Sequence, residues 1–180
     1  MRPEEKLRYA EKQGSFLVLA VPPRHLQRAE QELANRFQVE PVDGDALFLG
    51  AMKAEAEKIP VPWNTVLEAD AGTDSRHWEY LQILVSRVLP AIRTRLHDSR
   101  KTLLLTHPGL FARYSQLDLF QEIRATVSTS HGPHGLWMVI PGHGAGSQPK
   151  LSGKAIPITN DAQFEVLNEA WIANQHRGVN

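Results

Sequence analysis

Apolar residues fall into short continuous runs, separated by stretches in which they recur at helical spacing. The runs at residues 15–21, 102–106 and 136–140 predict buried strands, because a strand covered on both faces needs no polar positions. Shorter strands are predicted at residues 38–42 and 154–158. These five segments are the strands that the pattern predicts.

Helices are predicted between these strands. Residues 1–13 are mostly strong helix formers and end at Gly14, a typical C-cap residue. The longest helix starts after Asp74 or Ser75, and Pro90 inside it predicts a kink or a break. Residues 65–69 fit either a short strand or a helical turn. Further helices are expected after Pro23, from Asp43 to before Pro60, from about 115 to 127, and from Asp161 through Trp171.

Strands alternating with helices favour a three-layer α/β domain, in which a mostly parallel sheet is flanked by helices. The alternation runs through most of the chain, without an internal repeat or a change of composition. Residues 1–180 are therefore expected to form one domain. Residues 141–153, which hold four Gly and two Pro, are predicted to be a flexible loop.

Composition excludes several classes of protein. The 180 residues include 20 Lys plus Arg, 20 Asp plus Glu and no Cys, and 42% of them are apolar. Thiol chemistry is excluded, wholesale disorder is disfavoured, and the zero net charge removes the usual mark of a nucleic-acid binder. The charged N-terminus and short apolar runs predict neither a signal peptide nor a membrane span, so a cytoplasmic location is expected. No cofactor is predicted.

A candidate ligand site lies beyond the carboxyl ends of the predicted strands, where open α/β sheets bind ligands. If the strands are neighbours, three His and an Arg converge there. Such an edge would suit acid/base or metal-assisted phosphoester chemistry, and ordinary loop residues are the simpler interpretation. The ligand-facing candidates are Arg24, His25, Thr106, His107, Arg113 and His143.

Two other motifs do not meet the requirements for a binding site. The glycine-rich stretch at residues 142–147 follows a strand, but its glycine spacing fits neither a Walker A loop nor a dinucleotide fingerprint. His131, His134 and His143 could supply three metal ligands, yet no nearby carboxylate or Cys completes the set. We therefore predict no metal site.

Charge is unevenly distributed around the long helix. Residues 61–86 hold one basic and four acidic groups, whereas residues 87–113 hold six basic groups and one acidic group. The helix dipole favours this order, so structure alone explains most of it. The basic surplus suggests an anion or DNA contact, and its candidate residues are Arg93, Arg95, Arg100 and Lys101.

Three segments, at residues 103–114, 136–141 and 170–177, carry a resemblance to a known family. They resemble the C-terminal portion of the large kinase or ATPase components of BREX (phage growth limitation) defence systems. The similarity extends from Gly14 to Arg177. It implies an α/β module with a topology like that of P-loop ATPases, working inside a bacterial antiviral complex.

The chain departs from the active members of such families. It has neither a Walker A lysine nor the kinase motifs His-Arg-Asp and Asp-Phe-Gly, so neither activity transfers to it. We therefore predict a non-catalytic module that binds a larger protein component of the defence complex, with a nucleotide as a further ligand. The alternatives are a small hydrolase or phosphoester enzyme using the His-rich strand ends, and a DNA-contacting accessory subunit.

Overall fold

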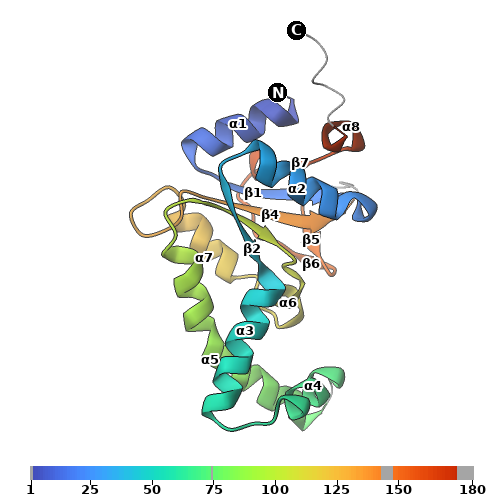
Figure 1. The fold of residues 1–180 in the computed structure, drawn as a ribbon, viewed down its shortest axis with the longest axis vertical. Helices are drawn as coiled ribbons and strands as arrows, with labels where there is room; N and C mark the ends of the chain where they lie inside the picture. Colours follow the sequence, from blue (N-terminus) through green and yellow to red (C-terminus); the bar gives the residue numbers. More distant parts are fainter. Residues whose placement is uncertain (1, 74, 143–147, 174–180) are drawn as a thin grey trace.

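The computed structural model describes residues 2–73, 75–142 and 148–173. Five parallel strands form its main sheet, in the order β2-β3-β4-β1-β7 (Figure 1). The first strand of the chain thus lies inside the sheet, next to the fourth. The strands are β1 (Phe16–Val21), β2 (Val39–Asp43), β3 (Thr102–Thr106), β4 (Gly135–Pro141) and β7 (Phe164–Val166).

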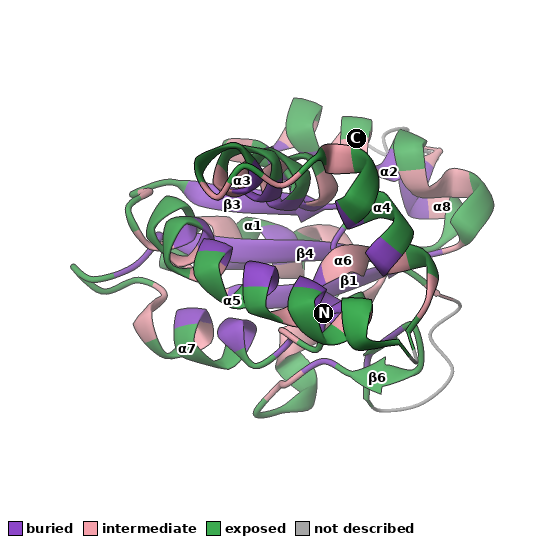
Figure 2. Ribbon diagram, turned by 90° about the horizontal axis from the view of Figure 1, so that it is seen from below, coloured by how far each residue is buried: buried purple, intermediate pink, exposed green. Residues whose placement is uncertain are grey.

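Helices cover both faces of the sheet, which confirms the predicted three-layer α/β class (Figure 2). One face packs against α1 (Pro3–Gln13), α2 (Leu26–Arg36) and α8 (Glu169–Ile172). The helices on the other side are α3 (Gly44–Lys58), α4 (Trp63–Ala71), α5 (Arg76–His97), α6 (Gly109–Arg113) and α7 (Leu119–Thr126). Two short 3₁₀ turns, η1 (Pro23–His25) and η2 (Asp161–Gln163), and a hairpin of β5 (Lys150–Leu151) and β6 (Lys154–Ala155) complete the described fold.

Strands β1, β3 and β4 are buried on both faces because alternate side chains enter two separate cores. In β1, Leu17 and Leu19 pack on the side of α1, α2 and α8, whereas Phe16 and Val18 pack on the opposite side. Trp137 of β4 is fully buried and meets the edge of Phe37 with ring centroids 5.2 Å apart. This double burial explains the continuous apolar runs in the sequence.

Capping residues define several helix ends as predicted. The Asp43 side chain accepts a hydrogen bond from the Ala46 amide at 3.0 Å, and Ser75 accepts from Trp78 at 3.3 Å. Gly14 ends α1 with a φ of 74°. Helix α5 continues through Pro90 as one helix of 22 residues instead of breaking in two. Residues 65–69 are helical, within α4.

Helices α3 and α5 extend beyond the sheet, and α4 lies at their far end (Figure 1). We call these three helices the arm. None of the helices in the described residues is long and apolar enough to cross a membrane.

The predicted final strand was wrong, and so was the first part of the predicted terminal helix, of which only the end is helical, as α8. Lys154 and Ala155 pair with β5 in the antiparallel hairpin and take no part in the main sheet. The fifth strand of the sheet is β7, which lies where the sequence pattern predicted a helix. It adds to the open edge of β1, with Val18 opposite Phe164, and this non-local pairing outweighs the local helical pattern.

The helix predicted from about residue 115 was also wrong at its start. Ser115 has a φ of 59°, in the left-handed region that ends a helix. The chain instead forms the short α6 before Ser115 and α7 after it, beginning at Leu119. Phe120 and Ile123 of α7 are fully buried, as the spacing of apolar residues predicts.

Candidate functional site

The carboxyl ends of β1 and β4 are where a sheet of this topology is expected to bind a ligand. The two strands are neighbours, and the chain leaves β1 towards β2 at one edge of the sheet and leaves β4 towards β7 at the other edge. The turn after β1 begins with Pro22 and Pro23. Because proline has no backbone N–H, these positions cannot contribute donors to a phosphate-binding loop.

Arg24 in this turn pairs with a carboxylate of α8, and His25 lies beside this pair. Arg24 Nη2 lies 3.2 Å from Glu169 Oε2, and His25 Nε2 lies 3.6 Å from Glu169 Oε1. Arg24 Nε also donates to His25 Nε2 at 3.0 Å. The three side chains tie the end of β1 to α8, and this is the ordinary role of a loop that joins two elements.

A second polar group lies at the ends of β2 and β3. His107 Nδ1 is 3.4 Å from Asp43 Oδ2. His107 has a φ of 47°, and its carbonyl oxygen approaches Gly44, where a Cβ atom would lie only 2.7 Å from it. Gly44 is therefore needed at the start of α3 for the two strand ends to lie this close.

Two further carboxylates border this pair. Burial raises the pKa of the Glu30 carboxyl above its ordinary value, the charge of Asp43 adds to the rise, and His107 opposes it. Burial and the Asp43 charge likewise raise the pKa of Asp45. Glu30 Oε1 is buried without a hydrogen-bond partner. Even so, no three His, Asp or Glu side chains within residues 2–73, 75–142 and 148–173 form a group that could hold a metal ion.

Among the predicted His, the described pair His25 and His107 does not meet the condition for convergence. Strand β4 lies between β1 and β3, so His25 and His107 follow strands that are not neighbours. Each has its own carboxylate partner, Glu169 or Asp43. Thr106 is buried and its hydroxyl donates to the Val42 carbonyl at 3.5 Å. His143 lies outside the described residues.

Arg113 is engaged with the arm. Its Nε donates to Asp70 Oδ1 at 2.8 Å, and the Tyr114 hydroxyl donates to the same oxygen at 2.9 Å. Burial, followed by the bond to Asp70, raises the pKa of the Tyr114 phenol well above its ordinary value. Asp70 thus joins α4 to the end of α6. Its carboxylate also pairs with the positive charge of Arg113, which a phosphate-binding residue would need to keep available.

Hydrogen bonds of one His side chain in the loop before β4, and of one backbone carbonyl of that loop, join the loop to the helices. His134 Nε2 lies 2.9 Å from the Glu11 carbonyl oxygen, and His97 Nδ1 lies 3.2 Å from the carbonyl oxygen of His131. These contacts join the loop to α1 and α5. They are structural contacts, of the kind expected where a loop crosses the ends of helices.

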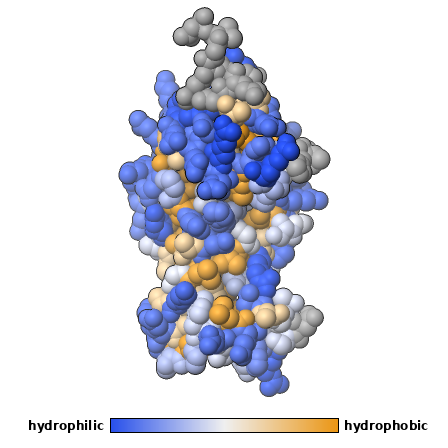
Figure 3. Space-filling view, turned by 45° about the vertical axis from the view of Figure 1, so that its right-hand side comes forward, coloured by the Kyte–Doolittle hydropathy of each residue, from blue (hydrophilic) through white to orange (hydrophobic). Residues whose placement is uncertain are grey.

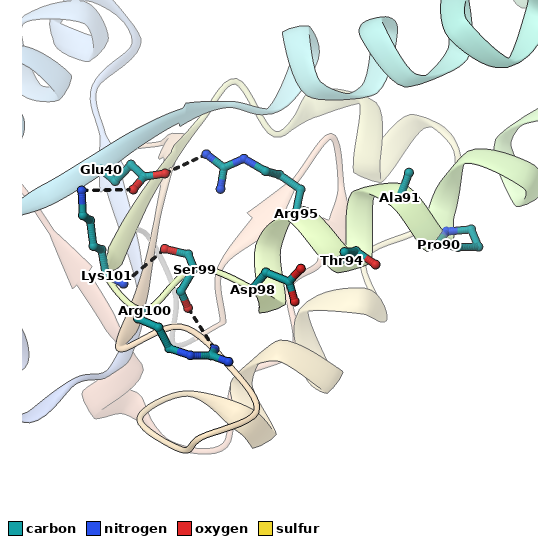
Figure 4. A pocket seen from close by; sticks show the side chains of 9 residues that line it. All are labelled: Glu40, Pro90, Ala91, Thr94, Arg95, Asp98, Ser99, Arg100 and Lys101. Carbon is teal, nitrogen blue, oxygen red and sulfur yellow. Dashed lines mark hydrogen bonds and ion pairs between the residues drawn. The ribbon is translucent and has the colours of Figure 1, made fainter.

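The predicted basic candidates lie around an open hollow of about 820 Å³ between α5 and β2 (Figure 4). Glu40 of β2 accepts from Arg95 at 2.7 Å and lies 3.8 Å from Lys101 Nζ. Arg100 Nη1 donates to three carbonyl oxygens, including that of Gly132 at 3.1 Å. The hollow therefore brings together three of the four candidates.

Arg93 points elsewhere. It pairs with Glu122 of α7, with Nε and Oε2 2.8 Å apart, and it is not among the residues that line the hollow. The basic surplus of the sequence is therefore divided between two faces of α5, and much of it is balanced by glutamates from other elements.

A second hollow, of about 280 Å³ and mostly apolar, lies on the arm where α4 packs against α5. Tyr80 and Ile83 line it with 59% and 54% of their surfaces exposed, and Leu67 of α4 is 51% exposed. Apolar atoms gather on the surface of the arm (Figure 3). Neighbouring exposed apolar side chains beside a hollow make this surface a candidate interaction site.

The apolar hollow was not predicted from the sequence. The available signal is that Tyr80 and Ile83 are apolar although they lie off the buried stripe that Leu81, Val85 and Val88 form. Such residues on the polar side of an amphipathic helix indicate a second contact surface.

Comparisons with known proteins give one match. No family model matches the chain, and no solved structure matches it. The Streptomyces coelicolor protein named probable kinase PglW is 29% identical over 189 aligned residues, which cover 99% of this chain and 12% of that protein. The chain thus spans about an eighth of the length of its relative. The predicted resemblance to a kinase component of the phage growth limitation systems is confirmed by this similarity along the chain.

Proposed function

We propose that this chain is a non-catalytic α/β module of a bacterial phage-defence system, acting in the cytoplasm, and that it binds a larger protein component of that system. The observation that carries the proposal is the similarity to PglW over 99% of the chain. The chain corresponds to a small part of that protein, and a part without catalytic motifs is best explained as a binding unit.

The strand ends support the non-catalytic assignment. The turn after β1 contains two prolines in place of a glycine-rich phosphate loop. The charged candidates at this edge, Arg24, His107 and Arg113, each face a carboxylate of the same chain. Neutralised groups of this kind hold elements together and offer little charge to a substrate.

Two experiments test this function. The tagged full chain is purified from its native host, before and during phage infection, and its partners are identified by mass spectrometry. We expect a component of the same defence system at near-equal amount. In parallel, deletion of the coding segment should raise the plating efficiency of a sensitive phage to that of a strain lacking the system. Unchanged resistance after deletion would contradict the defence role.

Nucleotide binding is tested separately, by the melting temperature of the purified chain with millimolar ATP and Mg²⁺. A ligand present at 100 times its Kd stabilises the folded state by about 2.7 kcal/mol. That would raise the melting temperature of a chain of this size by roughly 5–10 °C. A rise of this size would show that the module also binds a nucleotide. A rise accompanied by ATP hydrolysis would overturn the non-catalytic proposal.

A further inference from the structure

Both surface hollows lie along one face of α5. One row of α5 residues, three and four positions apart in alternation, contributes to both hollows. Its first residues line the apolar hollow and its last residues line the basic hollow. This spacing is that of the contact seam in a coiled coil, where one helix lies along another. Six of the seven side chains are exposed, and only Leu84 is buried. The row consists of His77, Tyr80, Leu84, Arg87, Ala91, Thr94 and Asp98.

Opposite the row, the segment after α3 and helix α4 line the apolar hollow, and Glu40 of β2 lines the basic hollow. Arg87 Nη1 lies 3.6 Å from Glu55 Oε1 of α3, at the point where the row passes from one hollow to the other. Arg95 reaches Glu40 of β2 further along. From His77 to Asp98 the row covers about 21 residues, or roughly 32 Å. We call this surface, from the α4 end to the start of β3, the α5 groove.

The two ends of the α5 groove differ in chemistry. At the α4 end, Tyr80 and Ile83 are more than half exposed. At the sheet end, the basic groups Arg95, Arg100 and Lys101 outnumber the acidic groups Glu40 and Asp98. A complementary ligand therefore needs apolar side chains at one end and negative charge at the other.

We infer that the α5 groove binds an amphipathic helix of about 20 residues from a partner protein, with apolar side chains seated at the α4 end and acidic side chains at the sheet end. The row spacing and its length match one helix lying along another. The inference rests on the proposed function and identifies the surface through which the module would bind its partner.

Other occupants fit these observations less well. Two copies of the chain packed through α5 would set either one basic end against the other or an apolar end against a basic end, so a second copy is not complementary. A nucleic acid would leave the exposed Tyr80 and Ile83 uncovered. A helix with two or three apolar anchors uses both ends of the groove.

Site-specific photo-crosslinking tests the inference in the full chain, expressed in its native host. A photoreactive amino acid is placed at position 83, at position 91 or, as a control, at the exposed position 86, which lines neither hollow. We expect positions 83 and 91 to capture the same partner within one segment of about 20–25 residues, and position 86 to capture none of it. The segment should hold apolar residues near the site captured by position 83 and acidic residues beyond the site captured by position 91.

The captured segment is then synthesised as a peptide and its affinity for the purified chain is measured by fluorescence anisotropy. Ile83→Glu and Arg95→Glu should each weaken binding at least tenfold. The matched controls Ser86→Glu and Arg93→Glu should change it less than twofold. Arg93→Glu is a close control because it breaks an ion pair of similar length on the same helix, with Glu122 in place of Glu40.

The outcomes separate this inference from the proposed function. If the tagged chain recovers a partner but positions 83 and 91 capture nothing, capture a second copy of the chain, or capture a basic or non-helical segment, the inference is wrong and the proposed function stands. Equal loss of binding in the control variants would also overturn the inference. If no partner is recovered at all, both fail.

Discussion

The carbonyl oxygen of His107 lies where a side chain on Gly44 would have to sit, 2.7 Å from an ideal Cβ position. This contact joins the end of β3 to the start of α3, and therefore joins the sheet to the arm. The oxygen belongs to the backbone of His107, and a Cβ atom would be bonded directly to the backbone of Gly44. Neither atom could therefore move without shifting β3 or α3.

Gly44→Ala should for this reason lower the free energy of unfolding by about 1–3 kcal/mol, the cost typical of overpacking. Chemical denaturation monitored by tryptophan fluorescence measures the change. The matched control is Gly50→Ala in the same helix, where a Cβ meets no atom within 4 Å; it should stabilise the chain by roughly 0.5–1 kcal/mol. Similar effects of the two changes would show that the strand ends are not closely packed.

The hydroxyl of Tyr114 bonds to the charged Asp70, so Tyr114→Phe should cost about 1.5 kcal/mol in the free energy of unfolding near neutral pH. Tyr80→Phe, at a position 59% exposed, should change it by less than about 0.5 kcal/mol. Because the folded state raises the pKa of Tyr114, it holds the phenol proton where the unfolded chain has released it. The stabilising effect is therefore complete below about pH 10 and declines above it.

Unfolding of the wild type and of Tyr114→Phe by denaturant, compared at pH 8 and at pH 10.5, tests this prediction. The difference between the two proteins should shrink at the higher pH. A difference that grows with pH would mean that Tyr114 ionises readily in the folded chain, and the bond to Asp70 would then be wrong.

Glu30→Gln should stabilise the chain slightly at neutral pH. Since burial raises the pKa of Glu30 above the ordinary 4.5, the folded state binds this proton more tightly than the unfolded state does. Stability therefore falls as the pH rises from about that value through the folded-state pKa. We expect a gain below about 0.5 kcal/mol at pH 7, because the carboxyl group is only partly buried and solvent screens its charge, and no gain at pH 4.

Thermal melts of both proteins across pH 4–7 provide the measurement. Destabilisation by Glu30→Gln at pH 7 would contradict the prediction, since it would show that the attraction of Glu30 to His107 exceeds the cost of burying its charge.

Duplex DNA should bind weakly to the basic hollow, in the nonspecific range of about 10⁻⁴–10⁻⁶ M at physiological salt. Arg95 and Lys101 share the single carboxylate of Glu40, and removing that negative charge by Glu40→Gln should tighten binding about two- to fivefold if phosphates are contacted there. Anisotropy of a labelled duplex, measured from 50 to 200 mM salt, checks both points. Tight binding that does not fall with salt would favour the DNA-contacting alternative through base contacts, and would count against the expectation.

Much of the fold could be predicted from local signals. The apolar runs gave the positions of β1, β3 and β4, because double burial leaves no polar positions in a strand. Asp43 and Ser75 predicted helix starts because capping involves only neighbouring residues. The failures are non-local. Strand β7 forms because β1 offers an open edge, and no pattern within residues 161–171 contains that information.

The candidate site was less predictable. The residue types at the strand ends were identified, but the strand order decides which of them meet, and β4 separates His25 from His107. The charged candidates pair with carboxylates that come from elsewhere in the chain, namely Glu169, Asp43 and Asp70. Pairing of this kind depends on long-range contacts and cannot be read from spacing.

The sequence by itself determined the three-layer class and the main buried strands, because strand burial and helix capping depend on residues that are close together in the chain. It also determined the similarity to a phage growth limitation component. Only the tertiary structure decided that α5 keeps one face open while its opposite face is buried. Both sides of the helix carry apolar residues, and the packing of α3, α4 and β2 determines which of them are covered and which form the α5 groove.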